Sequence, residues 1–422
     1  MMKLLSKLAR MWLTRSPKRF TFTNEYDEKL NFVECDNLGL YVHIPFCKKI
    51  CNFCPYCKTA FQKEKVEKYI SALLKEICLV GNRGKAETGE KKQVTSLYFG
   101  GGTPALVAPR LKEIISTLEE YFVITEGVGV ELHPDNVTVE TLKILKDAGV
   151  TKISIGVQSF QEKYQSILGR KPVNAEKMAA ALKEVPFETV SMDFIFALPT
   201  QTYEDLKADI ELAFSSGANH IAIYPFIDFT FTKSDVPVMP NRQKRKLLDQ
   251  ITKYCLGKGY VRNSIWTFSS EEQAGYSSMT RDNFLGFGCS ATTLLKDQFK
   301  VNTFSVEEYC KRIEEEKLPT SLTIRFTKWQ RMIYYLFWTA YSTKVSADDF
   351  EKFFGVPLKK AYGFELWIAK LFGFVKKEGG MYEMTLRGAF YYHYFENYYT
   401  LAYIDKMWGV MRKEAFPKGM KL

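Results

Sequence analysis

The chain has 422 residues, of which 46% are hydrophobic and 25% are charged. These values are typical of a globular protein with one large and one smaller domain, and they exclude a disordered or fibrous chain. The formal net charge is +11, but the excess is spread thinly, and no dense run of Lys and Arg is interleaved with aromatic residues. We therefore expect no nucleic acid as a partner.

The N-terminal stretch MMKLLSKLARMWLTRSPKRF is basic and loosely amphipathic. Charged residues interrupt its apolar ones too often for a membrane-spanning helix, so we predict no transmembrane segment there. We interpret residues 1–37 as a partly disordered leader. The chain shows no apolar core of a secretory signal, and its nine cysteines are an odd number. Both features favour a reducing cytoplasm over an oxidising compartment.

Strand-like apolar segments alternate with amphipathic, helix-like segments from about residue 38. The strand-like segments are LYVHIPF (40–46), TSLYFGGG (95–102), VGVELHP (128–134), TKISIGVQSF (151–160), ETVSMDFIFALP (188–199) and NHIAIYPF (219–226). This alternation predicts an α/β fold built from parallel β/α units. Six units are fewer than the eight of a closed barrel, so we expect an open, partial (β/α)6 barrel within residues 38–310.

In such a barrel, the residues that carry chemistry lie at the carboxyl ends of the strands. The densest group of cysteines follows the first predicted strand, and GGGTP follows the second. Glu131 stands near the end of the third strand and Gln158 near the end of the fourth, while Asp193 lies within the fifth and Tyr224 near the end of the sixth. We therefore expect motifs that are far apart in the sequence to meet at one mouth.

From about residue 322 the sequence is dominated by Phe, Tyr and Trp. Helix-like segments are followed by a short strand pair around FVKKEGGMYEMT, which predicts a winged-helix-like α+β domain over residues 322–415. Winged helices often bind DNA, but this one lacks a clustered set of polar residues that would read bases. We favour a role in packing or in covering a substrate.

Four cysteines fall within the eleven residues CKKICNFCPYC (47–57), with the spacing C-x3-C-x2-C-x2-C. Chance clustering and a structural zinc site are the simplest explanations, although structural zinc usually draws its ligands from two separated pairs. Three thiolates on one loop can instead converge on an iron–sulfur cluster and leave one iron open. An open iron is a site for a reaction.

At these residues the chain resembles the radical S-adenosylmethionine superfamily, and specifically its oxygen-independent coproporphyrinogen III oxidase family. YVHIPFCKKICNFC is similar to that family's cluster-loop motif. LYFGGGTPALV (97–107), VELHPDNVTVETLKILKDAGVTKISIGVQSF (130–160), MDFIFALPTQTYEDL (192–206) and GFGCSA (286–291) follow in the family's order. The resemblance covers roughly residues 38–310, and the TLRG segment (385–388) of the C-terminal domain fits it as well.

The resemblance implies that Cys47, Cys51 and Cys54 bind a [4Fe–4S] cluster whose fourth iron is chelated by S-adenosylmethionine. Cys57 is then not a ligand. It also implies that one or two molecules of S-adenosylmethionine bind. The residues implied to contact the cofactor are Tyr41, Phe53, Gly101, Gly102, Thr103, Glu131, Gln158, Arg170 and Asp193. For His43 and His133 we leave open whether they belong to the site or are ordinary hydrogen-bonded histidines.

The activity implied by the resemblance is reductive cleavage of S-adenosylmethionine to a 5′-deoxyadenosyl radical, which abstracts a hydrogen atom from a substrate. In the namesake reaction a tetrapyrrole propionate is decarboxylated oxidatively to vinyl. The electron is implied to come from a reducing partner such as flavodoxin or ferredoxin. Radical methylation, opening of a haem ring, and haem transport with little or no turnover are alternatives within the same family.

Three features depart from the family's pattern. Cys57 stands three residues after Cys54, one position later than the last cysteine of the oxidases. The N-terminal leader is unlike theirs, and Cys289 stands where relatives usually carry a small residue. A core cysteine is the simplest explanation of Cys289. Beside the site it is instead a candidate hydrogen donor, and we take it with Tyr41 as a candidate catalytic residue.

Overall fold

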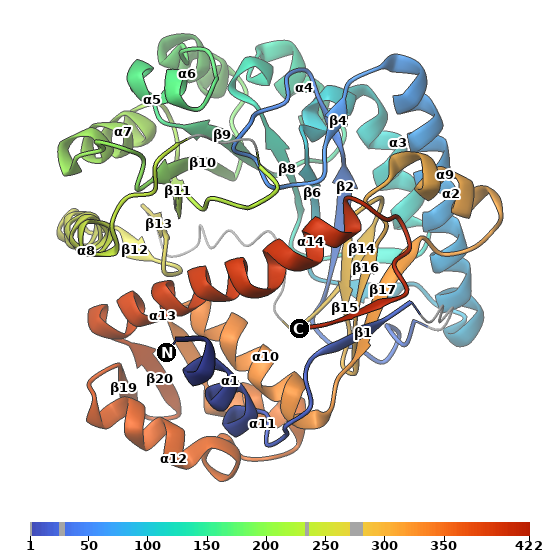
Figure 1. Ribbon diagram of the computed structural model, residues 1–422. Coiled ribbons are helices and arrows are strands. Elements are labelled where there is room, and N and C mark those ends of the chain that lie inside the picture. The colour runs from blue at the N-terminus through green and yellow to red at the C-terminus, as the bar shows by residue number, and fades with distance from the viewer. Residues whose placement is uncertain (1, 25–29, 233–235, 271–281) are drawn as a thin grey trace.

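A mixed sheet of 14 strands forms the centre of the protein in the computed structural model, which describes residues 2–24, 30–232, 236–270 and 282–422 (Figure 1). The strand order is β12-β13-β11-β10-β9-β8-β6-β2-β14-β15-β16-β17-β1-β21. Its middle part is parallel, and both edges are antiparallel. Among the described residues, we find no helix with the length and apolar character that crossing a membrane requires.

The six predicted parallel strands are confirmed. They are β2 (Leu38–Ile44), β6 (Leu97–Gly101), β8 (Val128–Leu132), β9 (Lys152–Gln158), β10 (Thr189–Phe196) and β11 (His220–Pro225). Each is buried over most of its length, as expected for parallel strands covered on both faces. A further strand that we did not predict, β14 (Asn283–Phe287), pairs parallel to β2 on the side away from β6.

Helices between the parallel strands cover the outer face of the sheet (Figure 1). They are α2 (Lys63–Thr88), α3 (Ala108–Glu119), α4 (Val139–Asp147), α5 (Glu162–Ile167), α6 (Ala175–Glu184), α7 (Tyr203–Ser215) and, after β11, α8 (Asn241–Gly257). Several begin at a side chain that caps the first turn. Thr138 accepts a hydrogen bond from the Thr141 amide, and Thr202 forms a capping box with Asp205.

The antiparallel strands extend both edges of the sheet. β15 (Thr292–Leu294), β16 (Gln298–Asn302) and β17 (Thr320–Arg325) continue from β14, with α9 (Val306–Glu314) between the last two. At the other edge β13 (Thr267–Ser269) pairs with β11 and with β12 (Val261–Arg262). Short strand pairs also form outside this sheet, between β3 (Phe46–Cys47) and β4 (Thr59–Ala60) and between β5 (Lys92–Val94) and β7 (Phe122–Ile124).

The C-terminal part has the predicted winged-helix-like character. Its helices α10 (Lys328–Tyr341), α11 (Ala347–Phe354) and α12 (Leu358–Leu371) accompany a sheet of β18 (Lys344–Ser346), β20 (Met381–Met384) and β19 (Val375–Glu378). The chain then continues through α13 (Leu386–Tyr399) and a π-helical turn, Thr400–Ile404, into α14 (Asp405–Met411). This helical segment runs across the open side of the barrel (Figure 1).

Both ends of the chain are built into the rest of the protein. Helix α1 (Met2–Leu13) lies against α12, with the rings of Trp12 and Phe364 6.2 Å apart and an ion pair of 2.7 Å between Arg15 and Glu365. Strand β1 (Thr21–Thr23) pairs with β17 and with β21 (Gly419–Lys421). The interval 1–37 therefore contains ordered structure, although we expected a partly disordered leader. The domain limits at residues 37, 310 and 322 remain predictions.

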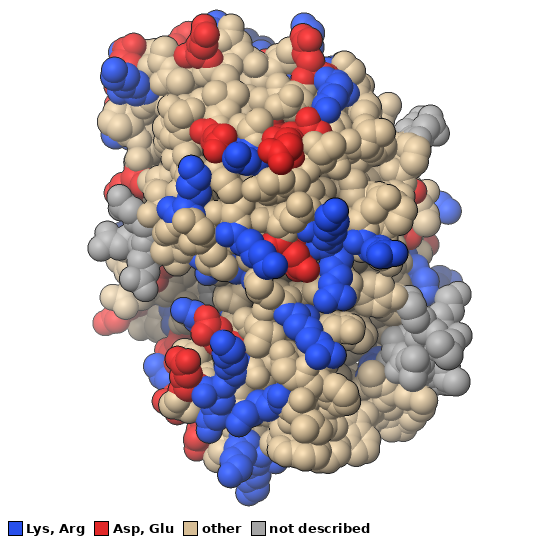
Figure 2. Space-filling model, turned by 90° about the vertical axis from the view of Figure 1, so that its left-hand side faces the viewer, with Lys and Arg blue, Asp and Glu red and all other residues tan. Residues whose placement is uncertain are grey.

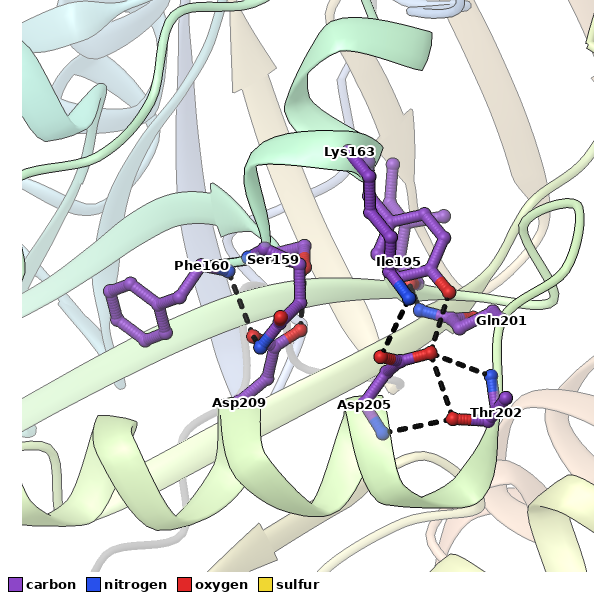
Figure 3. Close-up of polar contacts among 10 residues, drawn as sticks. Ser159, Phe160, Lys163, Ile195, Gln201, Thr202, Asp205 and Asp209 are labelled. Atoms are coloured by element: carbon purple, nitrogen blue, oxygen red, sulfur yellow. Dashed lines mark hydrogen bonds and ion pairs between the residues drawn. The ribbon is translucent and has the colours of Figure 1, made fainter.

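Two aspartates of α7 hold the turns that follow β9 and β10 (Figure 3). Asp209 accepts hydrogen bonds from the Ser159 hydroxyl (2.7 Å) and the Phe160 amide (2.9 Å), both directly after β9. Asp205 accepts from Lys163 (2.8 Å) and from the amide of Thr202 (3.0 Å). Burial raises the pKa of Asp209 to about 6, whereas hydrogen bonds from Lys163 outweigh burial at Asp205 and lower its pKa. These contacts fix the backbone at the carboxyl ends of two central strands.

The pairing of β14 with β15 depends on a glycine. A Cβ atom on Gly286 would lie 2.2 Å from the Thr292 carbonyl oxygen. We expect Gly286→Ala to lower the free energy of unfolding by about 1–3 kcal/mol, because the backbone has to move to admit the methyl group. Thermal melting measures this change. Gly257→Ala is the matched control, because nothing lies within 4 Å of its added Cβ, and an equal loss in both variants would contradict the explanation.

Candidate active site

The cysteine-rich loop begins where β2 ends. The short strand β3 leads directly into it, and backbone hydrogen bonds tie this stretch to the end of β6, from the Gly102 amide to the Ile44 carbonyl and from the Thr103 amide to the Phe46 carbonyl, both 2.8 Å. Cys47, Cys51 and Cys54 are half-buried, whereas Cys57 is 6% exposed. The loop thus separates three accessible thiols from a fourth that belongs to the core.

The three half-buried thiols lie in a tight and cationic environment. A Cβ atom on Gly102 would be 2.9 Å from the Cys47 Sγ, so any other residue at this position would press on that sulfur. Burial and then repulsion by Cys54 raise the pKa of Cys47 to about 11. Burial also raises the pKa of Cys51, and the positive charge of Arg170 opposes this rise. Burial thus disfavours free thiolates at Cys47 and Cys51, and a metal cation would stabilise them.

Glu131 on β8 and Asp193 on β10 carry half-buried carboxyl groups on the two strands that flank β9. Glu131 accepts hydrogen bonds from the Gly101 amide and the Tyr98 hydroxyl, both at 3.1 Å. Asp193 accepts from the hydroxyls of Ser154 (2.9 Å) and Ser191 (3.3 Å). Burial and repulsion by Asp193 raise the pKa of Glu131 to about 7, and burial raises the pKa of Asp193 to about 6. A ligand with positive charge or several hydroxyl groups would relieve this repulsion.

Tyr41 and His43 connect this carboxyl pair to the cysteine loop. A Cβ atom on Gly100 would lie 2.9 Å from the Tyr41 hydroxyl and 3.1 Å from a carboxylate oxygen of Glu131. The Tyr41 hydroxyl is 3.0 Å from Nδ1 of His43, and Nε2 of His43 is 3.0 Å from the Cys57 carbonyl oxygen. His43 is therefore a fully hydrogen-bonded residue that links two parts of the site.

Arg170 and Gln158 lie where the turn after β9 meets the loop. Nη1 of Arg170 donates to the Gly156 carbonyl (2.7 Å), and Lys49 of the loop donates to the Gly169 carbonyl (2.7 Å). Gln158 has a left-handed backbone with φ of 70°, a strained conformation for a residue with a side chain. Burial and repulsion by Arg170 lower the pKa of His133 to about 4, so His133 is neutral at pH 7.

The remaining predicted site residues, Phe53, Thr103 and Cys289, lie in three different surroundings near the cysteine loop. Phe53 packs against an apolar group that includes Ile195 and Phe226, at the carboxyl ends of β10 and β11. Thr103 is buried, with its hydroxyl 3.9 Å from the Cys47 sulfur. Cys289 is 0% exposed and lies beneath the cysteine loop, beside Cys57 and His43. The structure thus brings the predicted residues to one region, while their roles remain predictions.

Sequence reasoning missed several residues of this region. Tyr98 donates to Glu131, and Ser154 donates to Asp193. The alternation of side chains along β6 could have revealed Tyr98, because it faces the same side as Gly100. No sequence signal indicated that α14 covers the loop. The rings of Trp408 and Tyr56 are 6.0 Å apart, and Arg412 donates to the Pro55 carbonyl.

The arrangement fits the cofactors that the sequence predicts. Cys47, Cys51 and Cys54 supply three soft sulfur ligands on one accessible loop, next to the cradle that Gly102 leaves open. Such a set holds a [4Fe–4S] cluster with one iron free of protein ligands. The carboxyl groups of Glu131 and Asp193 and the guanidinium of Arg170 have the charges that the polar groups of S-adenosylmethionine would need, and their roles in binding remain predictions.

Comparisons with known proteins agree with this geometry. Residues 41–213 match the model of the radical SAM superfamily. The chain is 29% identical to a haem chaperone HemW of Bacillus subtilis over 295 residues, which are 66% of this chain and 76% of that protein. It is 27% identical to an oxygen-independent coproporphyrinogen III oxidase of Cereibacter sphaeroides over 315 residues, 67% of this chain and 68% of that one. The solved structure of coproporphyrinogen III oxidase (HemN) from Escherichia coli has the same fold, with a TM-score of 0.71, 20% identity and 92% coverage of both chains.

We expect single Cys→Ala variants to distinguish ligands from non-ligands. Cys51→Ala should lose the cluster because two thiolates cannot hold it, whereas Cys57→Ala should keep it. Iron and sulfide content after anaerobic reconstitution measures the outcome. Cys255→Ala is the control, because this buried cysteine lies on α8. Equal loss of iron in Cys57→Ala and Cys51→Ala would contradict the assignment.

Proposed function

We infer that the chain is a member of the radical S-adenosylmethionine superfamily and, within it, of the HemN/HemW family, because residues 41–213 match the superfamily model and the relatives described above belong to that family. From this premise we propose that it is an enzyme that acts on a tetrapyrrole, by oxidative decarboxylation of the kind catalysed by oxygen-independent coproporphyrinogen III oxidases. The observation that carries the proposal is that three accessible thiols and the half-buried carboxyl groups of Glu131 and Asp193 lie at the same mouth of the barrel.

The superfamily's cofactors, a [4Fe–4S] cluster and S-adenosylmethionine, supply a carbon radical that removes a hydrogen atom from a substrate. In our proposal Cys47, Cys51 and Cys54 hold the cluster, and Gly101 and Gly102 let the backbone approach the cofactor closely. Glu131 and Asp193 bind and orient its hydroxyl and ammonium groups, and Arg170 binds its carboxylate. Phe53, which stands between Cys51 and Cys54 in the sequence, would lie beside the adenine of the cofactor.

The residues around helix α14 are of the kind that would bind a large, flat and anionic substrate. Trp408 of α14 lies near the rings of Tyr56 (6.0 Å), Phe229 (6.2 Å, stacked) and Phe304 (6.0 Å), so aromatic surfaces surround the covered loop. Tyr224, at the end of β11, is 41% exposed and lies 6.0 Å from the Trp266 ring. Aromatic rings stack on a macrocycle, and Arg412 offers a cation for its carboxylates.

A haem chaperone is a second candidate. Two relatives among the curated proteins, from Bacillus subtilis at 29% identity and Lactococcus lactis at 28%, are named HemW haem chaperones. In that case the cluster loop would be retained while the bound tetrapyrrole is not altered. The Glu131–Asp193 pair supports binding of S-adenosylmethionine by either candidate, because two repelling carboxyl groups are costly to maintain unless a cofactor uses them.

One anaerobic experiment separates the two candidates. The reconstituted protein is incubated with S-adenosylmethionine and dithionite, together with either coproporphyrinogen III or haem, and the products are read by mass spectrometry. The enzyme should release carbon dioxide and 5′-deoxyadenosine from the coproporphyrinogen reaction, and Asp193→Asn should abolish both. Tight haem binding without 5′-deoxyadenosine or a changed tetrapyrrole would establish the chaperone instead.

An acidic electron carrier such as flavodoxin or ferredoxin is the reducing partner that we propose. Figure 2 shows that Lys and Arg side chains gather over the middle and lower part of one face of the protein. Helix α8 contributes exposed Arg242, Arg245, Lys246 and Lys253, with Asp249 as its only acidic residue. A basic face of this kind attracts an acidic protein at low ionic strength.

The raised pKa of Glu131 predicts pH-dependent binding of S-adenosylmethionine. Because this pKa is about 7, the side chain is a carboxylate above pH 7 and is protonated increasingly as the pH falls below it. We expect affinity, measured by calorimetry, to fall by up to about tenfold from pH 8 to pH 6. Glu131→Gln should weaken binding at pH 8 by about 1.5–3 kcal/mol and flatten the pH profile.

The matched control is Glu126→Gln, which changes an exposed carboxylate just before the other end of β8. This variant should bind like the wild type at every pH, and the cluster content of both variants should be unchanged. A pH profile in Glu131→Gln that follows the wild type would contradict the assignment of Glu131.

A further inference from the structure

The two cysteines that depart from the family's pattern meet in the fold. Cys57 ends the cysteine loop and Cys289 follows β14, yet their sulfur atoms and a ring nitrogen of His43 all lie within 4.8 Å of one another. All three residues are buried. The function proposed above uses neither sulfur, since it assigns the cluster to Cys47, Cys51 and Cys54 and gives Cys289 no role.

Each cysteine is held in place by its surroundings. The Cys57 Sγ donates a hydrogen bond to the Phe304 carbonyl oxygen at 3.2 Å. The Cys289 amide donates to the Tyr69 hydroxyl at 3.0 Å, and that hydroxyl donates to the His43 carbonyl at 2.7 Å. The two segments therefore hold the sulfur atoms within 4.8 Å of each other.

A metal site is the first alternative for a group of one histidine and two cysteines. His43 argues against it, because both of its ring nitrogens already have partners: Nδ1 contacts the Tyr41 hydroxyl and Nε2 contacts the Cys57 carbonyl. A metal would have to displace one of these hydrogen bonds. Two neighbouring thiols without a shared metal are instead suited to form a disulfide.

We propose that Cys57 and Cys289 are a redox-active dithiol that a small two-electron oxidant, such as a peroxide, converts into a disulfide. Two S–H bonds break and one S–S bond forms. The two electrons and two protons reduce the O–O bond of the peroxide to water or alcohol. The disulfide ties the cysteine loop to the turn between β14 and β15, and a thiol reductant reverses it.

The oxidised state changes the connections of the loop. Cys57 loses the hydrogen with which it contacts the Phe304 carbonyl, and the Phe304 ring lies 6.0 Å from Trp408 of the covering helix α14. The Cys57 carbonyl is also the partner of His43, which contacts Tyr41. Oxidation of Cys57 therefore changes its contacts in two directions. One leads through Phe304 to helix α14, and the other leads through His43 to Tyr41. This proposal is independent of which tetrapyrrole reaction the protein performs.

The test uses the reconstituted protein under anaerobic conditions. Diamide is added and then removed. Like a peroxide, diamide is a two-electron oxidant, and its N=N bond takes up the two hydrogens of the thiols. Free thiols are alkylated, disulfides are reduced and labelled with an isotopically different reagent, and each cysteine is assigned by mass spectrometry. We expect Cys57 and Cys289 to carry the second label, and dithiothreitol before alkylation to abolish it.

Variants and melting temperature give an independent readout. The oxidised wild type should melt at a higher temperature than the reduced protein, because the new bond restrains the unfolded chain. This shift should disappear in Cys57→Ser and in Cys289→Ser and persist in Cys255→Ser, whose cysteine is also 0% exposed. If a variant does not fold, the assignment of labelled cysteines in the wild type by mass spectrometry still decides whether Cys57 and Cys289 form the disulfide.

Three outcomes would overturn the proposal. Both cysteines could remain free thiols after oxidation, or Cys57 could pair with Cys54 in place of Cys289. Metal analysis of the purified protein could also find stoichiometric zinc that Cys57→Ser and Cys289→Ser both lose, which would establish the metal site.

Discussion

The site depends on the close approach of two backbones, the cysteine loop after β2 and the end of β6. Hydrogen bonds from Gly102 and Thr103 to the Ile44 and Phe46 carbonyls hold them together. Gly101 has φ of 131°, and a Cβ on Gly102 would collide with the Phe46 carbonyl oxygen at 2.6 Å. Only glycine permits this contact. The position of the three accessible thiols relative to the barrel strands follows from it.

The parallel strands then determine which side chains the loop faces. Glu131 is paired in register with Ser154, and Ser154 donates to Asp193 on the next strand. The carboxyl groups therefore lie across three neighbouring strands, where burial raises the pKa of both and the charge of Asp193 raises the pKa of Glu131 further. A protein without a ligand for them would gain stability by replacing them with apolar residues. We therefore attribute their presence to the proposed binding of a cofactor rather than to stability.

A second layer of contacts covers the loop from outside the barrel. Asp405 of α14 accepts hydrogen bonds of 2.8 Å from both the amide and the hydroxyl of Thr230, which anchors the helix above the carboxyl ends of the strands. Trp408 and Arg412 then contact the loop and the aromatic residues around it. The C-terminal segment thus packs over the loop, while its role in covering a substrate remains a prediction.

The sequence by itself determined the parallel strands, the cysteine loop and the end of the barrel at which the site lies. These features depend on local periodicity and on spacing along the chain, which the residues carry directly. The strand β14, the contact between Cys57 and Cys289, and the position of α14 over the loop were decided only by the tertiary structure. Each of them joins segments more than 200 residues apart, such as Tyr41 opposite Gly286 in β14 or Pro55 beside Arg412. No local pattern encodes such a pairing, because it results from how the whole sheet closes and which faces remain to be buried.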